Sequence, residues 1–213
     1  MDFDDLPTFH SDRAGKRNDR RQSNGTFNNG SDITRQPPLS LRPYHHLTFS
    51  NGFVYAPVPV APFTPISQPN VAAFLADGTS MRTGGRPDGT GEISDGPTPD
   101  DVSAFWFDAF GGFLGCDNAG PDDCTMEVTG LHWDPIANDE APAFTQKYSL
   151  PPCPAYRNCA LTLITFPSTA RRLSGLEVRA VRNGEPRRFF MDDMHMAWSN
   201  KTCDAGLLRQ QAQ

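Results

Sequence analysis

The stretch Arg187-Arg188-Phe189-Phe190-Met191-Asp192-Asp193-Met194-His195-Met196-Ala197-Trp198 carries the clearest strand pattern in this 213-residue chain. Side chains of a strand alternate between two faces, so Asp192 is expected to share its face with four apolar side chains: those of Phe190, Met194, Met196 and Trp198. Asn183-Gly184, just before this stretch, is typical of a hairpin turn. The pattern therefore predicts a strand over residues 187–198 that follows a tight turn.

Shorter strand-like runs fill most of the chain from Tyr44 onward, and turns rich in Gly, Pro and Asn separate them. They cover residues 47–55, 104–110, 125–131, 160–166 and 176–181. Within the first run, Asn51-Gly52 indicates a hairpin turn or a bulge, and the prolines of 53–67 predict an edge strand or extended arm. No segment shows sustained helical periodicity with caps. We therefore expect an all-β fold, an antiparallel β-sandwich of jelly-roll type with long loops.

Length and charge narrow the classes of protein further. A chain of 213 residues suits one domain, 1–213, and the net charge of −6 argues against general nucleic-acid binding. The sequence contains no run of about 18 apolar residues, so we expect no membrane span. Residues 10–42 are polar and basic with few aliphatic side chains, which predicts a loop insertion; its dibasic pairs are either solvated or a processing site.

Four of the five cysteines form two close pairs, Cys116 with Cys124 and Cys153 with Cys159. Each pair encloses a polar loop that contains proline, which favours two local disulfides. Zinc is the competing interpretation, but paired zinc ligands are usually separated by about two to four residues. Cys203 is left over, and it could be free, pair between chains, or bond a cysteine outside this sequence.

Three glycosylation sequons accompany the cysteines, at Asn24, Asn29 and Asn200. Together with the disulfides they favour an oxidising, secretory compartment and an extracellular protein. The chain does not start with an apolar signal-peptide core. We therefore expect it to be a segment of a longer secreted precursor.

Acidic pairs lie near both ends of the chain. An ionised carboxylate on an apolar face is costly unless it is paired or binds a metal. The first and last strands of a sandwich are often neighbours, so the two pairs could converge on a structural calcium ion. The candidate ligands are Asp4, Asp5, Asp192 and Asp193. Two alternatives stay open: Asp192 bonds backbone amides or an arginine such as Arg188, or a bulge turns it to solvent.

Four segments carry a resemblance to a known family: Phe3-Asp4-Asp5-Leu6, residues 44–52, residues 189–198 and residues 200–210. Together they resemble an uncharacterised C-terminal domain of secreted fungal proteins. More distantly, the acidic end segments are similar to calcium-bearing jelly-roll carbohydrate-binding modules. The resemblance implies a β-sandwich, an extracellular location and a structural calcium, with Asp4 and Asp192 as the best-matched ligands. It implies no activity, and residues 10–42 depart from its pattern.

Catalytic motifs are sparse in this sequence. It contains no Gly-x-Ser-x-Gly elbow, no His-Glu-x-x-His zinc helix and no phosphate-binding Gly-rich loop. Asp108 and Glu127 are the candidate carboxylates for glycoside hydrolysis, although each fits a solvated strand residue better. We therefore assign no catalytic residue, and an enzyme is not the favoured interpretation.

Sugar binding requires aromatic side chains that can stack on pyranose rings. The rings outside the expected core are Trp106, Trp133, Tyr148 and Tyr156, although each fits a packing residue better than a sugar platform. The favoured function is a non-catalytic module that binds extracellular polysaccharide or cell-wall material. The alternative is a structural or adhesive module that forms homo-oligomers or other protein assemblies through Cys203 or the proline-rich arm. A glycan-degrading enzyme is the third.

Overall fold

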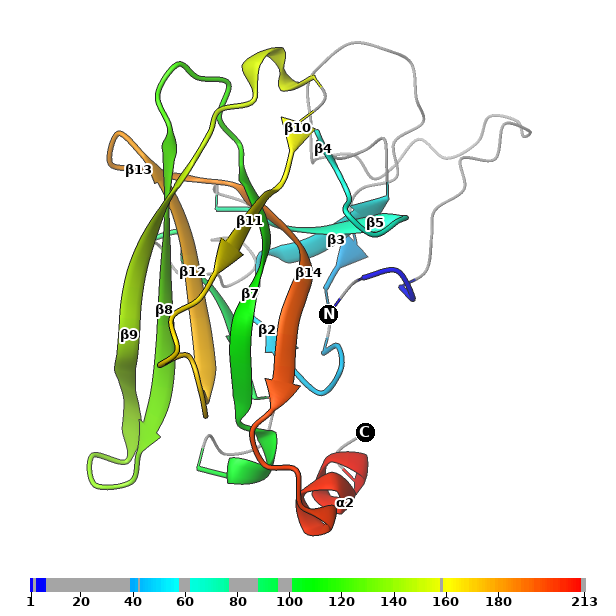
Figure 1. Ribbon diagram of the computed structural model, residues 1–213, viewed down its shortest axis with the longest axis vertical. Helices are drawn as coiled ribbons and strands as arrows, with labels where there is room; N and C mark the ends of the chain where they lie inside the picture. Colours follow the sequence, from blue (N-terminus) through cyan, green and yellow to red (C-terminus); the bar gives the residue numbers. More distant parts are fainter. Residues whose placement is uncertain are drawn as a thin grey trace, which may run out of the picture.

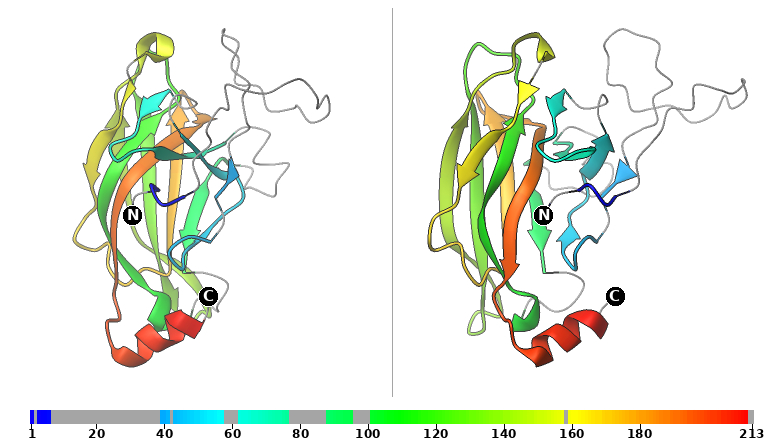
Figure 2. Two further views of the ribbon diagram at one scale, coloured as in Figure 1. Left: turned by 90° about the vertical axis from the view of Figure 1, so that its right-hand side faces the viewer. Right: turned by 45° about the vertical axis from the view of Figure 1, so that its right-hand side comes forward.

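The computed structural model describes residues 1, 3–6, 39–41, 43–57, 62–76, 88–95, 101–157 and 159–211 (Figure 1). Nearly all of the predicted insertion at 10–42 lies outside these ranges. Two large antiparallel sheets pack face to face, and Figure 2 shows them as two layers. The expected all-β sandwich is therefore confirmed, while its jelly-roll connectivity stays a prediction.

The first sheet has the order β1-β3-β5-β14-β7-β11. Its strands are β1 (Leu39–Ser40), β3 (Phe53–Pro57), β5 (Asn70–Phe74), β14 (Phe189–Trp198), β7 (Phe107–Cys116) and β11 (Thr162–Thr165). The predicted strand at 187–198 is thus central, between β5 and β7. The predicted strand at 104–110 begins later than expected, because Ser103–Phe105 forms a 3-10 turn, η1, before β7.

The second sheet has the order β2-β6-β12-β8-β9, and β13 also pairs with β12. Its strands are β2 (Thr48–Phe49), β6 (Gly91–Ser94), β12 (Gly175–Arg182), β8 (Cys124–Asp134), β9 (Asp139–Leu150) and β13 (Glu185–Arg187). A short parallel pair, β4 (Phe63–Thr64) with β10 (Cys159–Ala160), lies apart from both sheets. A second 3-10 turn, η2, spans Pro154–Tyr156.

The main core fills the space between the two sheets. The first sheet contributes buried rings such as Phe74 and Phe189, which stack with centroids 5.2 Å apart. Opposite them, β12 and β8 place Val178 beside Val128 and Ala180 beside Met126, all fully buried. Alternation along these strands sends every second side chain into this core, and the intervening ones face outward.

Two sequence predictions fail locally. Asn51-Gly52 is not a hairpin turn, because β2 belongs to the second sheet and β3 to the first, so the turn carries the chain between sheets. The tail is helical: α2 spans Cys203–Gln211, and the Thr202 hydroxyl caps it by accepting a hydrogen bond from Ala205 N at 3.3 Å. Only two of its nine residues are buried, so the sequence shows no apolar stripe.

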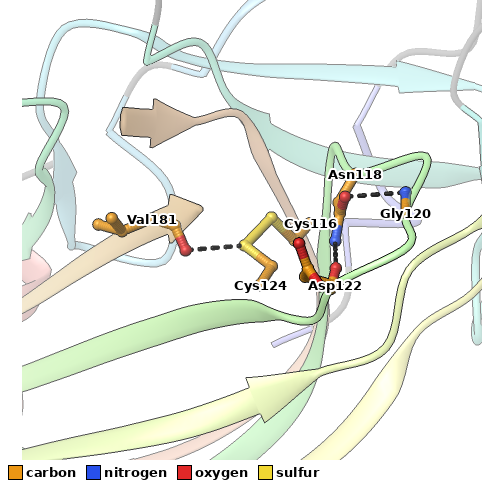
Figure 3. Close-up of a disulfide and its surroundings, with 6 residues drawn as sticks. All are labelled: Cys116, Asn118, Gly120, Asp122, Cys124 and Val181. Atoms are coloured by element: carbon orange, nitrogen blue, oxygen red, sulfur yellow. Dashed lines mark hydrogen bonds between the residues drawn. A yellow bond between two sulfur atoms is a disulfide. The ribbon is translucent and has the colours of Figure 1, made fainter. Parts of the chain in front are cut away.

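Both predicted disulfides form, Cys116–Cys124 and Cys153–Cys159, with Cα separations of 6.4 Å and 5.4 Å. The first closes the loop from β7 to β8 (Figure 3). Inside that loop, Asn118 is almost fully buried; its Nδ2 donates to Asp122 O at 2.6 Å, and its Oδ1 accepts from Gly120 N at 3.0 Å. The loop is therefore held by one covalent and two polar links.

Candidate functional site

A bulge changes which face Asp192 occupies. Asp193 has a left-handed φ of 46°, and the register of β14 against β7 shifts between Asp192 and His195. Before the bulge, Met191 points into the main core, and after it Met194 does. Asp192 therefore lies on the outer face with Phe190, opposite to Met194, Met196 and Trp198. The even alternation expected over 187–198 is wrong at this point, because the bulge inserts one extra residue.

Asp192 is buried on that outer face, with no exposed surface, beneath the segment that follows β4. Its Oδ2 accepts hydrogen bonds from Ile66 N at 2.7 Å and Ser67 N at 3.2 Å, and its Oδ1 accepts from Asp193 N at 2.8 Å. Burial raises the pKa of Asp192 from 3.8 to about 6, and the backbone hydrogen bonds oppose part of this rise. The carboxylate thus fits the alternative in which backbone amides satisfy it.

Two other candidate metal ligands, Asp4 and Asp5, belong to the chain start, which lies beside the last strand. Met1 exchanges backbone hydrogen bonds with Met194, so the chain start does meet the last strand. Residues 3–6 form a turn rather than a strand, and the buried Asn70 holds it by donating to Phe3 O at 2.9 Å and Leu6 O at 3.1 Å.

The carboxylates themselves have separate partners. Asp5 is exposed and accepts a hydrogen bond from Tyr44 Oη, while Asp193 Oδ1 accepts from Ser67 Oγ at 2.7 Å. Asp4 is half-buried. Within the described residues, no group of three or more His, Cys, Asp or Glu side chains is placed to hold a metal. Calcium therefore stays a prediction of the sequence.

The four predicted sugar-binding rings come from separate elements of the fold. Trp133 is near the tip of the β8–β9 hairpin, and Tyr156 is in η2 at the other end of the sandwich (Figure 1). Tyr148 joins the sandwich edge, since its Oη donates to Thr165 O at 2.9 Å and its ring packs near Phe166. The four rings do not form one platform.

A different set of planar groups gathers on the outer face of β7 and β14. The ring of Phe110 stacks with His195 at 4.7 Å between centroids, and the Arg171 guanidinium lies 4.2 Å from the Phe110 centroid. His195 comes from β14 and Arg171 from the segment on the opposite side of β7. We call Arg171, Phe110 and His195 the stacked row; it stands on this sheet with His195 exposed and the other two half-buried.

Asp108 fixes the base of this surface. One of its oxygens accepts hydrogen bonds from Arg172 N at 3.0 Å and from Ser199 Oγ, and the other lies 4.0 Å from Arg171 Nε. Arg171 is held further by Nη1, which donates to Ala109 O at 3.0 Å and Ala170 O at 2.9 Å. The row is therefore anchored by the sheet backbone before any ligand arrives.

Next to the stacked row, the Arg172 guanidinium lies 5.5 Å from the Trp106 ring centroid. Trp106 is thus the one predicted ring that adjoins the new cluster. The sequence pointed to neither arginine nor His195 as functional, since each fits an ordinary surface charge. The available signal was alternation along β7, which puts Asp108 and Phe110 on the face opposite the buried Phe107 and Ala109.

The structure separates the two candidate catalytic carboxylates. Glu127 lies on the outer face of the second sheet, where it pairs with Lys147 and Arg179. Asp108 lies on the outer face of the first sheet. Because the core stands between them, they cannot flank one glycosidic bond, and this pair does not support hydrolysis.

Three further predictions have partial answers. Asn200 uses its Oδ1 to accept from the Thr202 hydroxyl at 2.9 Å, and the sequons at Asn24 and Asn29 lie outside the described residues. Cys203 is an exposed free thiol. In the part of the chain that is described, no helix is long and apolar enough to span a membrane.

Comparison with known proteins gives a family but no activity. The chain matches no curated protein. Among solved structures it is similar to a DUF4465 family protein from Bacteroides caccae, with a TM-score of 0.45 and 12% identity over 72% of this chain and 82% of that chain. Residues 1–209 match DUF7371, described as a domain of unknown function, which confirms the expected likeness to an uncharacterised domain. The fungal source and the likeness to carbohydrate-binding modules stay predictions. The chain belongs to the DUF7371 family.

Proposed function

We propose that this domain is a non-catalytic extracellular module that binds glycan or cell-wall polymer on the outer face of β7 and β14. The observation that carries the proposal is the stacked row beside Trp106. Flat groups with ordered donors suit sugars, whose ring faces stack while their hydroxyls take directional hydrogen bonds. Asp108 and the backbone carbonyls preorganise these groups, which reduces the entropy lost on binding.

The two outer faces of the sandwich differ in a way that favours this choice. The outer face of the second sheet carries cross-strand pairs such as Glu127 with Lys147 and Thr129 with Thr145, as a solvated surface does. On the first sheet, the outer face around Phe190, before the bulge of β14, is covered by a second apolar cluster that also includes Phe63. The outer face of β7 and β14 beyond the bulge instead presents the stacked row.

An extracellular location is supported by the two disulfides, since such bonds persist in oxidising compartments. A structural calcium near the two acidic pairs remains part of the proposal. Calorimetry with calcium on chelator-treated protein tests it, and the absence of both binding heat and a thermal shift would end that part.

The test of the main function is retention on insoluble chitin, β-glucan, cellulose, mannan and de-esterified pectin, with calcium and with chelator. We expect retention on at least one polymer and reduced retention of His195→Ala, which removes an exposed stacking group. If the protein bound none of these polymers, the proposal would be contradicted. Retention lost only on chelation would connect the calcium site to binding.

A second candidate function is assembly between copies of the chain. The exposed Cys203 lies one helical turn from Leu207 on α2, and Leu207 and Leu208 are 55% and 48% exposed. Size-exclusion chromatography of the oxidised protein with and without reductant tests this. Assembly would be favoured if the native protein formed a dimer that dissociates in reductant, and if Cys203→Ser formed no dimer.

A further inference from the structure

Arg172 has a backbone conformation that few side chains adopt. Its φ is 55°, in the left-handed region that favours glycine, and in a residue with a long side chain this costs on the order of 1 kcal/mol. The Asp108 carboxylate holds the strained peptide by accepting from Arg172 N at 3.0 Å. The fold therefore keeps an arginine where glycine would be easier.

This conformation leaves the side chain exposed beside Trp106. The Arg172 guanidinium lies 5.5 Å from the Trp106 centroid, close enough for a cation–π contact. Among the described residues, we find no hydrogen bond or ion pair made by this guanidinium, whereas Arg171 donates to two carbonyls. Arg172 thus presents its planar fork of N–H donors to solvent, with Trp106 beside it.

Within the described residues, one carboxylate contacts both arginines of this surface. Asp108 lies 4.0 Å from Arg171 Nε and also accepts hydrogen bonds from Arg172 N and Ser199 Oγ. The net charge of −6 would repel a polyanion at long range, but salt screens that field beyond about 8–10 Å. A contact made directly by the guanidinium escapes most of this screening.

We infer that Arg172 and Trp106 form a subsite for a sugar carboxylate, so that the glycan bound by this face is a uronic-acid polymer. The inference rests on the proposed glycan-binding function and names its ligand class. A guanidinium binds a carboxylate through two parallel hydrogen bonds, and the indole beside it offers apolar surface to the pyranose ring. A neutral sugar would leave the guanidinium fork without its matching acceptor.

The test compares polygalacturonate with the same polymer fully methyl-esterified, by affinity electrophoresis at physiological salt. We expect the native protein to be retarded about tenfold more strongly by the acid form, the size of one charged hydrogen-bonded pair. Arg172→Gln should remove this preference. Arg157→Gln is the matched control, because it removes the same charge from an exposed site after η2, at the other end of the sandwich.

Arg172→Gly separates binding from folding. Glycine relieves the strain at φ 55°, so this variant should be at least as stable as the native chain and still lose the preference for the acid form. Equal retardation by both pectins, or full preference in Arg172→Gly, would overturn the inference while leaving the proposed function intact. If dextran sulfate retarded the protein as strongly as polygalacturonate, the inference would also be overturned, because attraction between charges alone would then explain the binding. No retardation by any glycan would overturn both.

Discussion

Asp192 shows how one residue's environment follows from a small backbone irregularity. The bulge at Asp193 turns Asp192 away from the core, and Ile66 and Ser67 then bury it beneath their backbone amides. The sequence predicted that this carboxylate needs a partner, and that prediction rested on the cost of burying charge. It could not predict the partner, because Ile66 and Ser67 are about 125 residues away along the chain.

This environment predicts a pH dependence of stability. The folded-state pKa of Asp192 is about 6 against 3.8 ordinarily, so the folded protein binds this proton more readily than the unfolded chain. The stabilisation is complete below pH 3.8 and is lost as pH rises through 6. The unfolding free energy of the native protein relative to Asp192→Asn should therefore fall by up to about 3 kcal/mol between pH 4 and pH 7.

Denaturant melts of both proteins at intervals across this range measure the change. Asp139→Asn, at the exposed start of β9, is the control for replacing a carboxylate by an amide at a surface position. A difference for Asp192→Asn that does not change with pH would contradict the raised pKa.

At the scale of elements, the sequence predicted strands well and connections poorly. The strong alternation of 125–131 and 176–181 gives β8 and β12, because both strands have one face in the core. The turn at Asn51-Gly52 was misassigned, since a tight turn looks the same whether it joins two strands of one sheet or two sheets. The stacked row escaped prediction because its members come from three segments that only the sheet order brings together.

Gly112 illustrates how closely the bulge of β14 packs on β7. A Cβ at this position would contact Met194 Sδ and lie 3.1 Å from Met194 Cα, where the backbone cannot easily shift. Gly112→Ala should lower the unfolding free energy by about 1–3 kcal/mol, as overpacking does. Chemical denaturation measures this, and an unchanged midpoint would show that the bulge is looser than described.

Gly206 should respond in the opposite direction. It lies inside α2 with no atom within 4 Å of an added Cβ. Alanine favours a helix interior over glycine by roughly 0.8–1 kcal/mol. Gly206→Ala should therefore raise the melting temperature. A lower melting temperature would mean that α2 does not form as described.

At the scale of the whole molecule, several links tie the ends of the chain to the sandwich. Phe3 is fully buried in the main core near Tyr44, and Arg209 of α2 donates to Ala104 O while its guanidinium lies 4.9 Å from the Trp198 centroid. Two loops, after β7 and after β9, are each closed by a disulfide. The expected sandwich is confirmed, and these links hold the chain start and α2 against it.

The disulfide between β7 and β8 should contribute to global stability. Cys116 and Cys124 are both buried and join a loop with a sequence separation of 8. Replacing both with serine should lower the unfolding free energy by about 2–4 kcal/mol, partly by releasing the unfolded chain. The matched double substitution of Cys153 and Cys159 gives the comparison. If both variants unfolded at the same denaturant concentration as the native protein, a stabilising role for the disulfides would be contradicted.

The central claim is that the outer face of β7 and β14 binds glycan, and its most direct measurement is polymer retention of two matched variants. His195→Ala alters the stacked row, while Lys147→Ala alters an exposed residue on the outer face of the second sheet. The account predicts that His195→Ala loses at least half of its retention on the polymer that the native protein binds, and that Lys147→Ala retains all of it. Equal retention by the two variants, or a loss confined to Lys147→Ala, would contradict the account.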